Sequence, residues 1–398
     1  MRPLRLLAYS TLFPNAAQPN HGIFVENRLR QLLATGEATA TVLAPVPYFP
    51  SAASVFGRWA EFARAPRQEV RHGVMVHHPR FPVIPRIGEA MAPFLLATAS
   101  RRALRRLVAG GLPFDLIDAH YVYPDGVAAV RLGAAFGRPV VITARGSDVT
   151  QLPDHAVPRR LIADALRRAD ALIAVSTALG ERLLALGADP AKVTVLRNGV
   201  DAAQFAPVDR AAARAALGLG DAPTLISVGG LVERKRHHLT IAAMTSLPGY
   251  RLLIVGEGPE REHLAAEIAR RGLGDRVRLL GAQPHDALPR FYGAADAMVL
   301  ASAREGWANV LLESMACGTP VVASNIPGNP EVVRECAAGV IVRENTAEGI
   351  AAAVRDLLAN PPDRAATRAY AERFGWAETS AGQLRVFRAM LARASARS

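Results

Sequence analysis

The sequence predicts an α/β protein made of two Rossmann-like domains, each with a doubly wound parallel sheet. Short apolar runs rich in β-branched residues alternate with amphipathic stretches, the pattern of repeated strand–helix units. This rhythm stops near residue 200 and then starts again. A chain of 398 residues is also too long for one ordinary domain and suits two of about 200 residues.

The first half contains five predicted strands. The opening MRPLRLLAYSTLFP has a short apolar stretch without a small-residue cleavage site, so it is interpreted as a strand and not as a signal peptide. The five strands are expected in RLLAYS (5–10), TATVLAP (39–45), DLIDAHY (115–121), PVVITARG (139–146) and DALIAVS (170–176).

The second half repeats the pattern after a connector, residues 197–223, which has an Asn-Gly turn, two prolines and no strand periodicity. Its strands are expected in TLISVGG (224–230), RLLIVGEG (251–258), RVRLLG (276–281), DAMVLAS (296–302) and TPVVAS (319–324). We therefore predict domains at 1–200 and 201–378. Ligands of open parallel sheets bind beyond the carboxyl ends of the strands, so the site is expected in a cleft that the two sheets face.

Composition narrows the class of protein. No apolar run reaches the roughly 18–20 residues that a membrane helix needs. Only two cysteines occur, Cys317 and Cys336, which favours a reducing, cytoplasmic location. Residues 1–200 hold 24 Lys and Arg against 14 Asp and Glu, whereas residues 201–398 hold 23 against 21. The first half is therefore expected to face an anionic partner, unless its arginines are simply solvated.

The segment REGWANVLLES (304–314) carries the most specific chemistry. Glu305 directly follows a predicted strand, and a helix is expected to begin near Asn309. The amino end of such a helix attracts a diphosphate. Glu313, inside the helix, is suited to accept hydrogen bonds from a ribose diol, and Glu305 from a sugar hydroxyl.

A second strand end supplies positive charge. In SVGGLVERKRHHL, Gly229 and Gly230 end a strand in a tight turn, and Arg234, Lys235 and Arg236 follow. Cations fixed there would stabilise a departing nucleoside diphosphate. A solvated basic turn is the simpler alternative.

These motifs resemble glycosyltransferase family 4, the retaining enzymes with the two-domain GT-B fold. EGWANVLLES resembles the family's E-x7-E motif, and further stretches resemble it in the same order, among them STLFPNAAQPNHGIFVENRLRQL, DLIDAHYVYPDGVAAV, TARGSDV, VGGLVERKRHHLTIAAM and SNIPGNPEVV. They cover most of the chain. The resemblance is to the branch that assembles exopolysaccharide, O-antigen or teichuronic-acid-like polymers.

The resemblance implies roles for individual residues. Glu313 would hold the nucleotide ribose and Glu305 the donor sugar, while Arg234 and Lys235 would bind the diphosphate. Backbone amides of the turn would cradle sugar and phosphate. His120 would lie at the reaction centre, and Gly22 in the loop that approaches both substrates. The turn in question comprises Gly306, Trp307, Ala308, Asn309 and Val310.

Two positions depart from the family pattern. Gly230 stands where many members have arginine, which leaves more of the phosphate charge to Arg234. Arg145-Gly146-Ser147-Asp148 replaces a His-Gly-x-Asp run. Because arginine cannot act as a base, Arg145 is expected to contact an anion and not to transfer a proton. Arg145 and Asp148 are expected on the acceptor side.

The implied reaction is transfer of a sugar from a nucleotide sugar, UDP-linked first and GDP-linked second, to a polysaccharide or lipid-linked saccharide. No Asp-x-Asp occurs, so no catalytic metal and no cofactor are expected. Nucleotide-sugar epimerisation or hydrolysis on the same fold is the alternative. A nicotinamide oxidoreductase is disfavoured because no G-x-G-x-x-G follows the first strand. Nucleic-acid binding is disfavoured because the basic residues lack an aromatic platform.

Two helices suggest contacts beyond the site. Residues 91–111 place Arg101, Arg102, Arg105 and Arg106 beside apolar positions, so this helix either lies on an anionic membrane as a peripheral contact or packs on the protein. By resemblance, the last helix, predicted at 379–398, crosses back onto the first domain.

Overall fold

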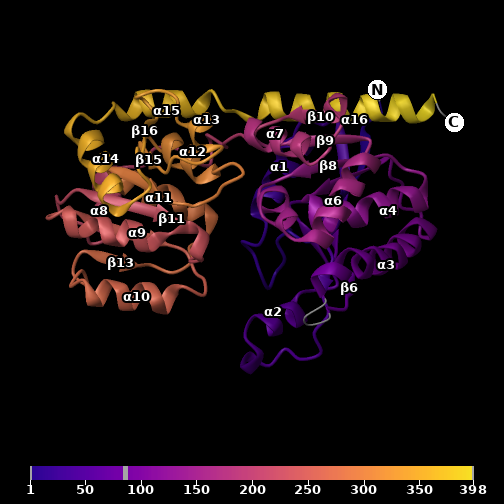
Figure 1. Cartoon of the computed structure of the whole chain (residues 1–398), viewed down its shortest axis with the longest axis horizontal. Coiled ribbons are helices and arrows are strands. Elements are labelled where there is room, and N and C mark those ends of the chain that lie inside the picture. The colour runs from indigo at the N-terminus through magenta and orange to yellow at the C-terminus, as the bar shows by residue number, and fades with distance from the viewer. Residues whose placement is uncertain (1, 84–87, 397–398) are drawn as a thin grey trace. The chain divides into compact units, whose positions relative to one another are not determined.

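The computed structural model describes residues 2–83 and 88–396, which form two compact units (Figure 1). The first unit comprises Met1–Arg197 with Ala377–Ser398, and the second comprises Asn198–Trp376. The sequence analysis places these divisions at 200 and 378. The Asn-Gly turn belongs to the second unit because Asn198 donates a hydrogen bond to Asn309 and a Cβ on Gly199 would lie 2.8 Å from the carbonyl carbon of Gly375.

The first unit is built on an eight-stranded sheet in which only the edge strand β4 runs antiparallel to its neighbour. Buried parallel strands are apolar on both faces, and β7, β8 and β9 are buried at every residue. In spatial order the strands are β10 (Val193–Val195), β9 (Ala171–Ala174), β8 (Val140–Ala144), β7 (Leu116–His120), β1 (Leu4–Tyr9), β2 (Ala38–Leu43), β5 (Val74–His77) and β4 (Gln68–Arg71). A separate pair joins β3 (Val46–Pro47) to β6 (Arg80–Phe81).

Helices cover both faces of this sheet. Leu6 of β1 packs with Leu384 and Phe387 of the last helix, whereas Tyr9, on the opposite face, hydrogen-bonds Ser100 of α3 at 3.0 Å. The helices are α1 (Ile23–Leu33), α2 (Arg58–Arg64), α3 (Gly88–Ala109), α4 (Val127–Phe136), α5 (Ser147–Thr150), α6 (Ala156–Arg168), α7 (Thr177–Ala185) and α16 (Trp376–Ser395), with short turns η1 (Ser54–Phe56), η2 (Val122–Gly126), η3 (Leu152–Asp154) and η4 (Pro190–Lys192).

The second unit has a six-stranded, fully parallel sheet. Its order is β13 (Val277–Leu279), β12 (Arg251–Val255), β11 (Thr224–Val228), β14 (Ala297–Leu300), β15 (Val321–Ala323) and β16 (Gly339–Ile341). The helices are α8 (Arg210–Ala216), α9 (His237–Ala243), α10 (Arg261–Arg270), α11 (Leu288–Ala294), α12 (Asn309–Ala316), α13 (Asn329–Val332), α14 (Ala347–Ala359) and α15 (Arg364–Glu372), with turns η5 (Glu233–Lys235), η6 (Met244–Ser246) and η7 (His285–Ala287).

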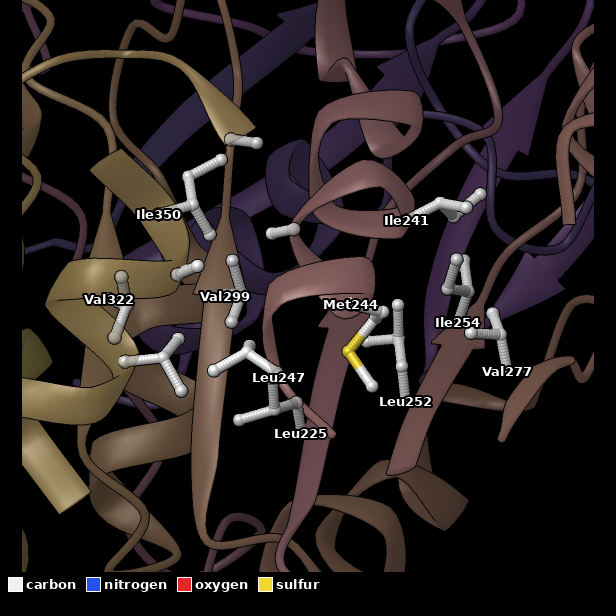
Figure 2. Packing of buried hydrophobic residues seen from close by; sticks show 14 of the residues in the cluster. Leu225, Ile241, Met244, Leu247, Leu252, Ile254, Val277, Val299, Val322 and Ile350 are labelled. Carbon is white, nitrogen blue, oxygen red and sulfur yellow. The ribbon is translucent and has the colours of Figure 1, made fainter. Parts of the chain in front are cut away.

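Figure 2 shows the core on one face of this second sheet. Leu225, Leu252 and Val299 of the strands pack against Ile241 of α9 and Ile350 of α14. Helices α11 and α12 lie on the other side and contact β11 and β14. The predicted fold class, two doubly wound parallel sheets, is confirmed.

The strand order reverses at one place in each sheet, between β1 and β7 and between β11 and β14. Loops that leave the carboxyl ends of strands at such a reversal diverge and leave room for a ligand. The predicted site residues follow these four strands or their neighbour β8.

The arginine-rich stretch 91–111 lies mostly in helix α3, which packs on the first unit. Leu96 and Leu104 are fully buried, and the helix packs along α4. Arg101, Arg102, Arg105 and Arg106 are exposed. The helix therefore packs most of its apolar face on the protein and presents the four arginines, together with Met91 and Val108, to solvent. Among the helices of the described ranges, none has the length and apolar composition required to cross a bilayer.

Candidate functional site

Glu305 lies at the centre of a charged cluster on the second unit. It follows β14 in a loop, and its carboxylate accepts a hydrogen bond from Lys235 Nζ at 2.6 Å while Arg234 Nη1 lies 3.7 Å away. Burial alone would raise the pKa of Glu305, but the charges of Lys235 and Arg234 outweigh it and hold the pKa below its ordinary value. The carboxylate is therefore ionised at neutral pH and offsets one of the two positive charges.

Glycines allow the loops around this cluster to approach one another. A Cβ on Gly256 would lie 1.9 Å from the Gly229 carbonyl oxygen, and one on Gly258 would lie 2.3 Å from that of Leu231. The turn after β11 therefore packs directly on the turn after β12. Ala303 N donates to Arg234 O at 2.8 Å, which joins the basic turn to the Glu305 loop.

The predicted backbone cradle lies at the start of α12, which begins at Asn309 as expected from the sequence. Trp307 and Ala308 are buried, and Trp307 packs near Phe374 with ring centroids 6.3 Å apart. Gly306 is supported from behind, because a Cβ on Gly328 would lie 3.1 Å from its carbonyl oxygen. The buried side chains of Trp307 and Ala308 thus hold the turn in place. A ligand would therefore contact the backbone of the turn.

Glu313 lies inside α12 and is held by partners that the sequence analysis does not identify. Tyr292 donates its hydroxyl to Glu313 Oε2 at 3.2 Å, and His285 Nε2 lies 3.2 Å from Oε1. Gln204 Nε2 lies 2.9 Å from His285 Nδ1. Since the amide nitrogen only donates, Nδ1 accepts and the imidazole carries its proton on Nε2, directed at Glu313.

His237 lies beneath the same basic turn. It is buried, and Ser227 Oγ lies 3.1 Å from its Nδ1. Burial, and then the charge of Lys235, lower the pKa of His237 to about 4, so the imidazole is neutral. It belongs to the packing under the turn.

On the first unit, His120 ends β7 within a buried polar group. Arg145 Nη2 donates to His120 Nδ1 at 2.7 Å, and Asp118 Oδ2 lies 3.3 Å from Nε2. Burial lowers the pKa of His120 and lowers that of Arg145 to about 10. His120 is therefore neutral, accepts from Arg145 and directs its Nε2–H at Asp118. The guanidinium of the buried Arg145 therefore contacts His120 inside the unit and does not point to an open surface.

Asp148 binds backbone amides of the first unit. Its buried carboxylate accepts hydrogen bonds from the amides of Val122, Arg145 and Gly146, at 2.8, 3.2 and 2.7 Å. These amides begin the loops after β7 and β8, so Asp148 holds both loops in place.

Gly22 caps α1 in the left-handed region, with φ of 69°, and a Cβ there would lie 2.3 Å from the Leu12 carbonyl carbon. The loop after β1 can therefore fold back on itself only with glycine at this position.

Two further buried residues brace the first unit and are absent from the sequence prediction. Asp125 accepts from Thr11 N and, at 2.9 Å, from Thr11 Oγ1. Arg28 of α1 donates to Gln383 Oε1 and to Leu196 O, each at 3.0 Å. Leu196 and Gln383 lie just before and just after the two places where the chain passes between units. Across residues 2–83 and 88–396, no three His, Cys, Asp or Glu side chains gather as a metal site would require.

Family models match both halves of the chain. "Glycosyltransferase Family 4" matches residues 54–204, and "Glycosyl transferases group 1" matches residues 209–374. The D-inositol 3-phosphate glycosyltransferase of Segniliparus rotundus is 35% identical over 300 residues, 70% of this chain and 66% of that protein. The protein of the same name from Mycolicibacterium gilvum is 33% identical over 67% of this chain and 64% of its own length. The chain thus spans just under two thirds of these relatives.

Solved structures share the fold along the whole chain. Sucrose-phosphate synthase from Thermosynechococcus elongatus superposes with a TM-score of 0.82 at 23% identity, covering 99% of this chain and 100% of its own. Anabaena HepE in complex with UDP gives a TM-score of 0.71 at 20% identity, covering 97% and 100%.

Proposed function

The chain belongs to the family 4 glycosyltransferases of the GT-B fold, and from this premise we propose that it transfers a sugar from a nucleotide sugar to a saccharide acceptor with retention of configuration. The observation that carries the proposal is the cluster of Glu305, Lys235 and Arg234 beside the start of α12, with Glu313 about one turn inside that helix. A dianionic diphosphate matches the two cations, and a ribose diol matches Glu313.

The proposed steps use residues of the second unit. Lys235 and Arg234 bind the diphosphate and stabilise its charge as it leaves the sugar. The phosphates then share the two cations with Glu305, and the Glu305 carboxylate accepts a hydrogen bond from a hydroxyl of the donor sugar. The backbone from Gly306 to Val310 lines the diphosphate, with no catalytic metal or cofactor assigned.

On the first unit, His120 and Gly22 are proposed to lie beside the reacting sugar and the acceptor. His120 is neutral and its ring nitrogens face Arg145 and Asp118, so its contribution is a positioned, uncharged surface at the end of β7. Arg145 and Asp148 are proposed to position this region on the acceptor side.

UDP is the first candidate for the nucleotide, and GDP the second. HepE, described in complex with UDP, supports the first choice through the shared fold. For the acceptor we propose a lipid-linked saccharide or a cell-surface polysaccharide, assembled at the cytoplasmic face of the membrane. The relatives named D-inositol 3-phosphate glycosyltransferase support a phosphorylated polyol as a second acceptor class.

A ligand screen tests the donor assignment. Thermal unfolding is measured with UDP, GDP, ADP and their sugars, in the presence of chelator, for the natural protein and for Glu313→Gln. We expect UDP or GDP to raise Tm, and the variant to lose most of that rise. NMR of the products then separates transfer to an acceptor from epimerisation or hydrolysis. Stabilisation by NAD(P) alone, or by no nucleotide, would overturn the proposal.

A further inference from the structure

The segment 48–62, between β3 and β4, gathers five aromatic residues at the edge of the first unit; we call it the aromatic lobe. Its rings pack on one another, with Phe49 5.3 Å from Phe56 and 5.7 Å from Trp59, and Trp59 5.7 Å from Phe62. The lobe leaves much apolar surface exposed: Tyr48 is 58% exposed, Val55 84%, Phe56 46% and Trp59 39%. Aromatic rings that pack together yet stay this exposed mark an interaction surface.

The lobe is fastened to the body of the unit. Arg80 of β6 donates to the carbonyl oxygen of Phe62 at 2.8 Å and also to that of Ala65, so it closes the end of α2. Gln18, in the loop after β1, donates to Glu61 at 2.9 Å. Tyr48 N donates to Phe81 O at 2.7 Å. Figure 1 shows α2 beside β6, away from the large sheet. The exposed rings are therefore presented on a braced platform.

The surroundings of the lobe are strongly basic. Residues 38–113 contain ten arginines and three glutamates, a net charge of +7 out of +12 for the whole chain. Arg64 and Arg67 are exposed next to the lobe, and the four arginines of α3 are exposed on a helix that contacts β6. A partner that fits both the exposed aromatic rings and the arginines has an anionic surface with an apolar layer beneath it.

We propose that the aromatic lobe inserts into the interface of an anionic lipid bilayer, with the neighbouring arginines on lipid head groups. Tryptophan, tyrosine and phenylalanine favour the membrane–water interface, and arginine clusters favour anionic lipid. A second copy of the chain fits poorly, because it would bring the same positive charge to the contact. Helix α3 supplies mainly charge, since most of its own apolar face is buried. The inference deepens the proposed membrane-side acceptor, but the binding step itself requires no sugar transfer.

Vesicle binding tests the proposal with the full-length protein and no nucleotide. Sedimentation with phosphatidylglycerol-containing vesicles is followed together with tryptophan emission, which shifts to the blue when an indole leaves water. We expect binding with a blue shift, loss of the shift in Trp59→Phe, and at least ten-fold weaker binding in Val55→Ser and Phe56→Ser. Val157→Ser and Leu184→Ser are the controls, because these residues lie outside the lobe and are 47% and 41% exposed, close to the 46% of Phe56.

The charge contribution is measured with a variant of α3 in which Arg101, Arg102, Arg105 and Arg106 become glutamine. We expect this variant, and vesicles of phosphatidylcholine alone, to bind weakly. Equal binding by the lobe variants and the natural protein would overturn the proposal, as would self-association that Val55→Ser abolishes. UDP stabilisation of the same samples reports the donor site separately, so failure of either proposal is seen by itself.

Discussion

Among single residues, His285 has the clearest consequence for the donor site. Gln204 donates to its Nδ1, and this fixes the tautomer that donates from Nε2 to Glu313. Tyr292 donates to the other carboxylate oxygen. Glu313 thus has one partner on each carboxylate oxygen, and the two contacts fix the plane of the carboxyl group. A carboxylate oriented in this way is ready to accept two ribose hydroxyls.

We predict that His285→Leu weakens the binding of UDP about ten-fold, because an orienting hydrogen bond to a charged group contributes roughly 1.5–3 kcal/mol. Calorimetric titration measures the loss. His285→Gln is the matched control, since its amide can donate to Glu313 and should retain most of the affinity. The natural protein should prefer UDP to its 2′,3′-dideoxy analogue, and His285→Leu should lose much of that preference. An unchanged preference would contradict the role of His285 in ribose binding.

At the scale of elements, the loop after β1 depends on one carboxyl group. Asp125, in the turn after β7, bonds both the amide and the hydroxyl of Thr11. Burial raises the pKa of Asp125 to about 7, although the bonds from Thr11 lower it. Because the native state binds this proton more tightly than the unfolded chain, Asp125 contributes stability below pH 4 that is lost as pH rises toward 7.

We predict that Asp125→Asn flattens the dependence of stability on pH. Asparagine can still accept from Thr11 N, and its amide does not ionise as pH rises. Denaturation of the natural protein between pH 4 and pH 7 should show stability falling by at most about 1.4 kcal/mol per pH unit relative to the variant. Asp164→Asn, at an exposed site on α6, is the control. If both proteins had parallel pH profiles, the assigned pKa of Asp125 would be wrong.

The elements that the sequence predicts are those whose pattern is local. All ten predicted strands are present, because a buried parallel strand is a continuous apolar run bounded by turn residues. The short strands β10 and β16, each three residues at an edge of its sheet, were not predicted. The hairpin of β4 and β5 was missed because its turn uses His72 and Gly73, both at positive φ, in a polar context.

The candidate site divides in the same way. Glu305, Glu313 and Lys235 are predictable because each stands at a fixed offset from a strand end or helix start. Their partners are distant in sequence: His285 lies 28 residues from Glu313, and Arg28 lies 355 residues from Gln383. Such pairs form only when the sheets assemble, so a local sequence pattern cannot predict them.

For the whole molecule, the two units differ in charge as well as in the ligands that they are proposed to bind. Each unit has its own sheet and its own core. The second holds the cations suited to a diphosphate, and the first holds the aromatic lobe and most of the net positive charge. Nucleotide and membrane should therefore act on separate parts of the chain, and each ligand should stabilise the segments that it contacts.

Hydrogen exchange followed by mass spectrometry can test this separation. We predict that UDP slows exchange mainly in residues 229–236 and 305–313, whereas anionic vesicles slow it mainly in residues 48–62. Glu313→Gln should remove only the first effect and Val55→Ser only the second, because the substitutions lie in different units. Protection by UDP that fell on residues 48–62 and spared 305–313 would contradict the assignment of the donor to the second unit. Independent responses would instead mean that the membrane surface and the donor site act as separate functions of the two units.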